Sequence, residues 1–404
     1  MSSRSNKSRK RVPTSPDSDS SLTSLSDSDD EPVTKRARGT KAVAPSVDVL
    51  DMEDNELFQS VLRSDGIEEA SENWIVAYQG EPHESLAQLV TFLFRLCGCT
   101  ATITSDEVQD SEHVDDVLER IQDEFAQHLH SQYPIVSRSK SLKNIRKHAA
   151  LLIKKIFSDA SEAELLSDED FLDTWQQWLL AMSVSSLRSF RHTSSLVAMW
   201  TIGAFSHELE QVRENYDVAV RQRDAEAKRQ SANRTRLVHT AHKMEQLDSL
   251  RESLDAHLDD YVKHVFSPRS RDFDALVRLD CVDQLGSWMK EFPTQYLQEY
   301  YLRHVGAALS DPDVTVRLHA LRSIKNVLVP EHAIQLVSFS ETHKSRMVDM
   351  ALYDVDLGVR TTAFAVLESA NELDMLSNDD RAALAVHIFD LESRIRAAAA
   401  AFLN

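Results

Sequence analysis

The sequence has little glycine, proline or cysteine. Only 8 of its 404 residues are Gly and 10 are Pro, whereas 42 % are hydrophobic. Folds rich in β-turns need Gly and Pro at those turns, so this composition favours long helices. The three cysteines, Cys97, Cys99 and Cys281, form neither a disulfide framework nor a CxxC pair. We therefore expect a reducing, intracellular compartment.

Long uncharged runs are also lacking. The longest stretch without Asp, Glu, Lys or Arg is HTSSLVAMWTIGAFSH, at residues 192–207. It is shorter than the ~20 apolar residues that a membrane-spanning helix needs. We therefore expect no membrane partner.

Motifs of enzymes and metal sites are missing. The sequence has no P-loop, GxGxxG, HExxH or GxSxG pattern. The histidine pairs in HLH (128–130) and HTAH (239–242) have no convincing set of further ligands, which favours solvated histidines. We expect no enzymatic activity, no cofactor, no metal and no small-molecule substrate.

Charge is unevenly distributed along the chain. The net charge is −20, but residues 1–41 hold nine Lys/Arg against six Asp/Glu, so the remainder carries −23. An acidic body repels polyanions in general. Any contact with nucleic acid must therefore come from local basic patches.

Residues 1–50 are rich in Ser and Asp and poor in large apolar residues, so we expect a disordered tail. Two basic clusters in it, KSRKR and KRAR, suit an importin-type receptor or nucleic acid. The alternative is a solvated run of charge. The candidate residues for nuclear import are Lys7, Arg9, Lys10, Arg11, Lys35, Arg36 and Arg38.

Two basic patches lie in the acidic remainder. The segment 138–155 has seven cations and no acid, and residues 221–243 have seven cations against two acids. Neither patch interleaves aromatic residues, which favours contact with DNA phosphates over base stacking. The alternative for both is a solvated helix face. The candidate DNA-binding residues are Arg138, Lys140, Lys143, Arg146, Lys147, Lys154, Lys155, Arg221, Arg223, Lys228, Arg229, Arg234 and Arg236.

Residues 204–267 contain neither Gly nor Pro. Apolar residues are spaced for helix packing at both ends of this stretch, whereas residues 221–236 have no large apolar side chain. We expect two antiparallel helical arms, each ~40 Å long, with a tip near Ser231–Asn233. One unbroken helix is the alternative. Helices are also expected within 73–79 and 85–99, the latter stopped by Gly98.

A pattern of Asp, a branched residue and Arg before an apolar run occurs four times. Its arginines, Arg278, Arg317, Arg360 and Arg396, are 39, 43 and 36 residues apart. Periods near forty are typical of HEAT repeats. We expect Asp311 to cap the second helix of its unit, with Pro312 in the first turn, and each Arg to pair with an Asp of the neighbouring repeat. These residues are therefore structural candidates, and the predicted fold is an all-α HEAT-type solenoid with a protruding helical hairpin.

The run SFRHTSSLVAMW, at 189–200, resembles the hallmark of the STAG domain of the stromalin family, the HEAT-repeat subunit of cohesin. The segment 264–348 resembles that family's stromalin conservative domain through LVRLDCVDQLGSWMKEF, YLRHVGAALSDPDVTVRL and HKSRMVDM. The resemblance covers residues 54–404. Family members are far longer, so we expect an N-terminal portion or a truncated member.

The resemblance implies a scaffold that binds the kleisin subunit, the cohesin ATPase core and duplex DNA. It also implies a nuclear, chromatin-associated role in sister-chromatid cohesion and chromosome segregation, with DNA bound in the helical concavity. Family members capture aromatic peptide motifs with an aromatic residue and an arginine, and these positions are Ala307 and Thr342 here. The rival hypothesis is an unrelated HEAT-repeat adaptor such as a nuclear transport receptor.

The expected organisation has five regions. They are a disordered tail (1–50), an N-terminal helical region with the STAG motif (51–204), a long hairpin (205–263), the stromalin conservative domain (264–348) and further, truncated HEAT repeats (349–404).

Overall fold

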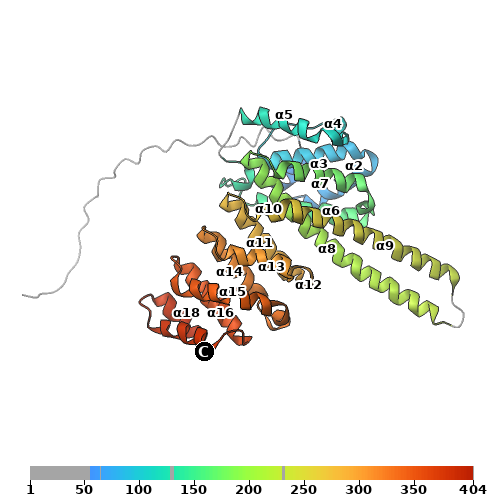
Figure 1. Ribbon diagram of the computed structural model, residues 1–404. Coiled ribbons are helices and arrows are strands. Elements are labelled where there is room, and N and C mark those ends of the chain that lie inside the picture. Colours follow the sequence, from blue (N-terminus) through green and yellow to red (C-terminus); the bar gives the residue numbers. More distant parts are fainter. Residues whose placement is uncertain (1–54, 64, 128–131, 230–232, 404) are drawn as a thin grey trace, which may run out of the picture. The chain divides into compact units, whose positions relative to one another are not determined.

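A computed structural model describes residues 55–63, 65–127, 132–229 and 233–403, and every regular element in these ranges is helical (Figure 1). The predicted all-α solenoid with a long hairpin is confirmed. The expected disordered tail and its basic clusters lie outside the described residues. Within the described part, no helix is long and apolar enough to cross a membrane.

Most of the helices are joined to the next one by a short connection. The helices are α1 (Glu56–Arg63), α2 (Ile67–Gly80), α3 (Pro82–Cys97), α4 (Ser105–Gln109), α5 (Val114–Ala126), α6 (Ile145–Glu162), α7 (Glu169–Ser183), α8 (Arg188–Ala227), α9 (Arg234–Tyr261), α10 (Ser267–Arg269), α11 (Ala275–Glu291), α12 (Pro293–Tyr296), α13 (Glu299–Ala308), α14 (Val314–Val327), α15 (Ala333–Tyr353), α16 (Leu357–Glu372), α17 (Asn378–Ala385) and α18 (Ser393–Leu403). Short 3-10 turns are η2 (Ser111–His113), η3 (Pro134–Val136), η4 (Leu165–Ser167), η6 (Pro330–His332) and η7 (Val386–Phe389), and η5 (Val262–Phe266) is a π turn.

Helix α3 is buried on nearly all sides at the centre of the N-terminal helices. It ends at Gly98, which adopts φ 82° and donates its backbone N–H to the carbonyl of Arg95 at 3.0 Å. A side chain at Gly98 would also press on the ring of Pro134, at 3.2 Å. The predicted helix stop is therefore confirmed, because glycine tolerates this left-handed conformation.

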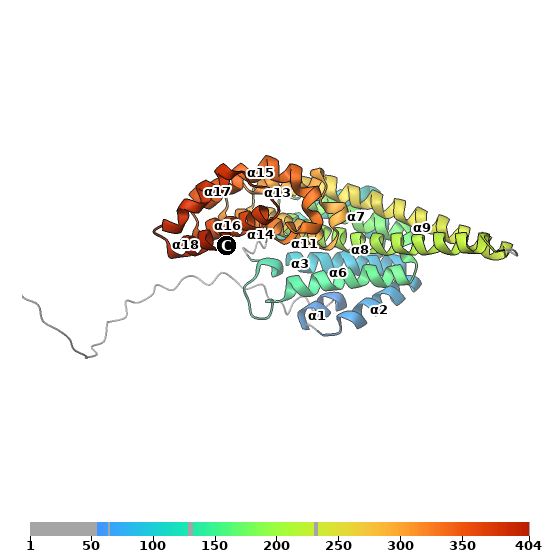
Figure 2. The same ribbon diagram turned by 90° about the horizontal axis from the view of Figure 1, so that it is seen from below.

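Helices α8 and α9 form the predicted hairpin, and their distal halves extend beyond the other helices (Figures 1 and 2). α8 ends at Ala227 and α9 begins at Arg234, so the alternative of one unbroken helix is wrong. Asn233 caps α9 by accepting the backbone N–H groups of Thr235 and Arg236 at 3.0 and 3.3 Å. The expected boundary between residues 204 and 205 falls inside α8.

The C-terminal half stacks helices α11, α14, α16 and α18 side by side, beginning against α8. Three of them start on an aspartate: Asp274 caps α11, Asp313 caps α14 and Asp356 caps α16. The expectation that Asp311 caps α14 is wrong. Pro312 precedes the cap and does not lie in the first turn, because Asp311 is used for the ion pair described below.

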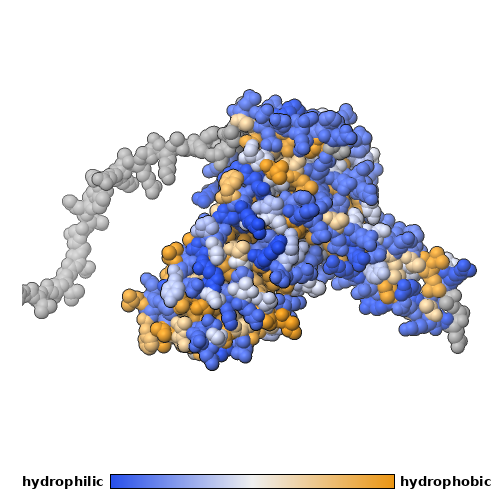
Figure 3. Space-filling view, viewed as in Figure 1, coloured by the Kyte–Doolittle hydropathy of each residue, from blue (hydrophilic) through white to orange (hydrophobic). Residues whose placement is uncertain are grey.

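Apolar surface gathers over the C-terminal helices in the space-filling view, whereas the N-terminal helices present a mostly hydrophilic surface (Figure 3). Val355, Phe389 and Leu391 are each at least 80 % exposed. Val355 and Leu391 lie beside aspartates in the loops that lead into α16 and α18, and Phe389 ends η7 directly before Asp390. The core of the protein lies between the stacked helices.

Candidate nucleic-acid interface

The first basic patch lies on the loop before α6 and on α6 itself. Arg138, Lys140, Lys143 and Lys147 are exposed, and none makes an ion pair with another described residue. Because no acid occurs between residues 138 and 155, no acidic neighbour within this segment neutralises these four cations. We call Arg138, Lys140, Lys143 and Lys147 the loop patch.

The other three cations of this segment have acidic partners. Arg146 forms an ion pair with Asp280 of α11, and Lys155 forms one with Asp159. Lys154 lies 3.7 Å from Glu291, with both side chains about half exposed. A phosphate would have to compete with Asp280 for Arg146. The loop patch is therefore the part of the segment with cations free to meet DNA.

Arg146 is the half-exposed end of a chain of hydrogen bonds whose other members, Asp280, His192 and Tyr133, are buried. His192, in α8, donates from Nε2 to Asp280 at 2.7 Å, because a carboxylate can only accept. Its Nδ1 is hydrogen-bonded to the hydroxyl of Tyr133 at 2.5 Å. Burial favours a raised pKa for Asp280, but His192 and Arg146 outweigh it and hold that pKa below its usual value. His192, beside Thr193 and the serines of the STAG motif, is thus a structural residue.

Arginine–aspartate pairs connect each helical repeat to the next. Arg278 donates from Nε and Nη2 to Asp311 at 2.7 Å each, and Arg360 donates to Asp390 at 3.0 Å. Arg317 pairs in the same way with Asp354, one repeat further on. We call these pairs the arginine ladder.

The ladder arginines also hold the loop of their own repeat. Nη1 of Arg278, Arg317 and Arg396 donates to the carbonyls five and six residues earlier, at 2.8 to 3.3 Å. Arg360 differs and donates to the carbonyl of Ala351 at 3.1 Å. Arg396 has no acidic partner among the described residues and is exposed. The paired arginines therefore hold loops and neighbouring repeats together, whereas the exposed Arg396 holds the loop of its own repeat.

Sequence reasoning missed the first member of the ladder. Arg191, in the STAG motif, donates from Nε to Asp272 at 3.1 Å, and both side chains are buried. Its Nη1 donates to the carbonyls of Ser185 and Ser186, as in the later repeats. The spacing gave no signal, because the hairpin separates Arg191 from Arg278. The residues before Arg191 also lack the Asp–apolar–Asp run that precedes Arg278 and Arg317.

The second basic patch lies at the distal end of the hairpin. Arg221, Lys228 and Arg234 are exposed and make no ion pair with a described residue. Arg223 contacts its neighbour Asp224 at 2.9 Å. Arg229 and Arg236 lie near Glu226, at 2.8 and 4.0 Å. This end of the hairpin is cationic but partly neutralised.

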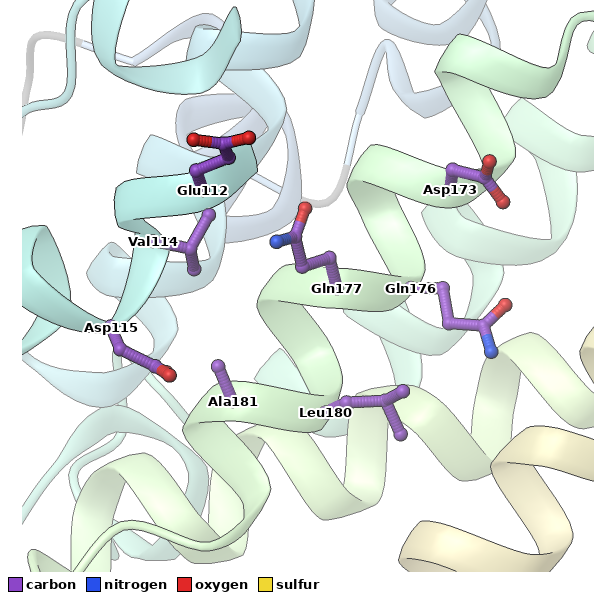
Figure 4. A pocket seen from close by; sticks show the side chains of 8 residues that line it. All are labelled: Glu112, Val114, Asp115, Asp173, Gln176, Gln177, Leu180 and Ala181. Atoms are coloured by element: carbon purple, nitrogen blue, oxygen red, sulfur yellow. The ribbon is translucent and has the colours of Figure 1, made fainter. Parts of the chain in front are cut away.

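A groove between α5 and α7 has the opposite charge (Figure 4). Its volume is about 470 Å³, and the carboxylates of Glu112, Asp115 and Asp173 stand around it. The described residues that line this groove include no Lys or Arg, so its carboxylates repel DNA phosphates. Of the two histidine pairs, His128–His130 lies outside the described residues, and His239 and His242 are exposed. In the described part of the chain, no group of side chains could hold a metal ion.

The two positions related to peptide capture lie on α13 and α15. Ala307 is exposed and lines a cavity of about 450 Å³, together with Arg303 and His304. Thr342 is exposed and donates its hydroxyl to the carbonyl of Ser338 at 2.9 Å. Neither position offers the aromatic ring or the guanidinium of the family pattern.

Two family models match the chain. The STAG domain model matches residues 131–243, and the stromalin conservative domain model matches residues 271–344. The first match includes the loop patch, α6, α7, α8 and the beginning of α9, and the second includes α11 to more than half of α15. The ladder residues Arg278, Asp311 and Arg317 lie in the second match.

Relatives and a solved structure agree with these matches. The chain is 27 % identical to cohesin subunit psc3 of Schizosaccharomyces pombe, over 82 % of this chain and 34 % of the relative. It is 26 % identical to cohesin subunit SCC3 of Saccharomyces cerevisiae, over 85 % and 32 %. It is 25 % identical to sister-chromatid cohesion protein 3 of Arabidopsis thaliana, over 83 % and 30 %. The chain thus spans about a third of the length of the curated relatives it matches.

The structure of cohesin subunit Scc3 from Z. rouxii has the same fold, with a TM-score of 0.78 and 23 % identity over 87 % of this chain and 42 % of that chain. The two domain matches, the relatives and this fold agree over most of the sequence. The chain thus carries a STAG domain and a stromalin conservative domain and is similar over most of its length to these cohesin subunits.

Proposed function

We propose that this chain is a non-enzymatic scaffold of a cohesin complex that binds duplex DNA through its phosphate backbone. The observation that carries the proposal is the loop patch. Its four exposed cations have no acidic partner among the described residues, in a chain whose net charge is −20. Screening at physiological salt acts over ~8 Å, so distant acids oppose phosphate binding less than this local cluster favours it.

Contact with phosphates gives affinity without reading base sequence. The loop patch has no interleaved aromatic side chain on which a base could stack. We therefore propose that binding depends on salt and hardly on sequence. The cations at the distal end of the hairpin are a second contact.

Charge reversal tests the DNA proposal. We expect Arg138→Glu, Lys143→Glu and Lys147→Glu together to abolish most binding to a short duplex. The matched control reverses Arg63, Lys263 and Arg394, three exposed cations outside both patches and without ion pairs to described residues. The control should bind almost as the unchanged protein does. Equal losses of duplex binding in both variants would contradict a DNA-binding site at the loop patch.

We further propose the kleisin subunit and the cohesin ATPase core as partners, and a chromatin-associated location in the nucleus. The named relatives, which are cohesin subunits, support this assembly. A pull-down from nuclear extract tests it. Recovery of kleisin and the ATPase heads is expected. Recovery of a transport GTPase or of import cargo instead would favour the rival adaptor.

A further inference from the structure

One carboxylate at the distal end of the hairpin is buried among exposed residues. Glu226 lies in the last turn of α8, and its side chain is only 11 % exposed. It accepts the backbone N–H of Asn233, the cap of α9, at 2.9 Å. A single side chain of α8 therefore holds the beginning of α9.

The same carboxylate holds two of the cations. Nη1 of Arg229 donates to Glu226 at 2.8 Å, and Nη1 of Arg236 lies 4.0 Å from it. Arg229 follows α8 and Arg236 lies in the first turn of α9. The two guanidinium groups thus converge on one acid from the two arms.

A groove of about 550 Å³ lies between the arms at this point. It is lined by Gln222, Ala225, Glu226, Arg229, Thr235, Arg236, His239 and Thr240. Arginine, threonine and glutamine side chains supply many of the hydrogen bonds that proteins make to phosphate oxygens. Among the described residues of this lining, Glu226 alone carries a carboxylate.

We propose that this groove binds phosphate groups of the nucleic-acid backbone, and that Glu226 positions Arg229 and Arg236 until a phosphate replaces it. The inference rests on the proposed DNA binding. It adds a second site, at which the carboxylate of Glu226 competes with the phosphate for the two arginines. The planar guanidinium matches a carboxylate and a phosphate equally well in shape. The exchange leaves both arginines paired, and Glu226 keeps the hydrogen bond from Asn233.

The variant Glu226→Gln in the full chain tests the competition. Glutamine keeps an oxygen that can accept the N–H of Asn233 but loses the charge that holds the arginines. We expect severalfold tighter binding to a short duplex by fluorescence anisotropy. We also expect a steeper dependence of log K on log salt, by up to roughly 0.9, because the substitution removes one negative charge beside the bound phosphate.

Asp224→Asn is the matched control. Asp224 lies two residues from Glu226, its side chain is exposed, and among the described residues it forms an ion pair only with Arg223. It should raise the affinity less than Glu226→Gln does. Arg229→Ala with Arg236→Ala should weaken binding, and in the Glu226→Gln background it should remove the gain. If Glu226→Gln loosens the hairpin, the double variant Arg229→Ala, Arg236→Ala in the otherwise unchanged chain still tests whether the groove binds DNA.

Equal gains from Asp224→Asn and Glu226→Gln would overturn the inference, because general charge would then explain both. Unchanged binding by Glu226→Gln and by the double arginine variant would also overturn it, while leaving DNA binding at the loop patch intact. Absence of salt-dependent duplex binding by the unchanged protein would instead remove the proposed function together with this site.

Discussion

Arg317 donates two hydrogen bonds of 2.9 Å each to Asp354, a residue 37 positions further along the chain in the next repeat. Both side chains are less than a tenth exposed. Burial alone would raise the pKa of Asp354, but the guanidinium of Arg317 outweighs it and lowers that pKa. This pair therefore joins two helical units, and the buried carboxylate of Asp354 depends on the guanidinium of Arg317 to stay charged.

We expect Arg317→Ala to lower the free energy of unfolding by ~1–3 kcal/mol, because it leaves Asp354 buried without its cation. Urea denaturation measures this change. Arg396→Ala is the matched control, since Arg396 is exposed and donates only to carbonyl oxygens of its own loop. We expect a smaller loss there. Weaker DNA binding with unchanged stability in the Arg317 variant would contradict a structural role.

Arg146 and Lys147 are neighbours with different expected roles. Arg146→Ala should destabilise the fold, because Asp280 loses one of its two partners in the chain of hydrogen bonds. Lys147→Ala should leave the melting temperature almost unchanged and flatten the slope of log K against log salt by ~0.9. Thermal unfolding and duplex titration of both variants separate the roles. The reverse pattern would mean that Arg146 is a phosphate contact and Lys147 a structural residue.

The burial of His304 leads us to expect a loss of stability in mildly acidic solution. Its burial, aided by Arg303 and Arg271, lowers the pKa of its imidazole to about 4. The unfolded chain, with an ordinary pKa of ~6.5, then binds more protons between about pH 6.5 and 4, so the free energy of unfolding falls as the pH decreases through this range. We expect His304→Gln to reduce this slope in urea titrations at several pH values. An unchanged slope would assign the effect to other histidines.

Aspartates with lowered pKa values lead us to expect a second loss of stability at lower pH. Asp390 has a pKa of about 2, set by the backbone N–H of Glu392, by His387 and by Arg360. A carboxylate of this kind stabilises the fold above the unfolded pKa of ~3.9, and the contribution is lost as the pH falls through the folded value. Between about pH 4 and 2 the protein should therefore lose further stability. Asp390→Asn should show a smaller loss in that range.

The basic clusters of the N-terminal tail remain candidates for nuclear import. Deletion of residues 1–41 in a fluorescent fusion should reduce nuclear accumulation, because both clusters, KSRKR and KRAR, lie in this segment. Microscopy of the two fusions measures the change. Unchanged accumulation would indicate that the protein enters the nucleus with a partner.

The fold was predictable from the sequence because its signals are local or periodic. Gly98 marks a helix stop, the missing apolar face of residues 221–236 marks the end of the hairpin, and the spacing of Arg278, Arg317 and Arg360 marks repeats. The cap of α14 was wrongly assigned because two aspartates flank Pro312. Only the three-dimensional arrangement tells which of them meets an arginine of the preceding repeat.

The candidate site was less predictable, because basic residues look alike in a sequence. Nothing near Arg146 indicates that its partner is Asp280, a residue 134 positions away. The same holds for Arg191 and Asp272, which the hairpin separates. Pairing across distant elements decides which cations stay free. The loop patch therefore emerges only when the ion pairs are known.

The central claim is that the loop patch binds DNA phosphates, and the salt dependence of duplex binding tests it most directly. We expect Arg138→Ala, Lys143→Ala and Lys147→Ala together to weaken binding and to flatten the slope of log K against log salt by roughly 3 × 0.9. The three side chains have no acidic partner to lose among the described residues, so the melting temperature should stay almost unchanged. A triple variant with the affinity and slope of the unchanged protein would contradict the account.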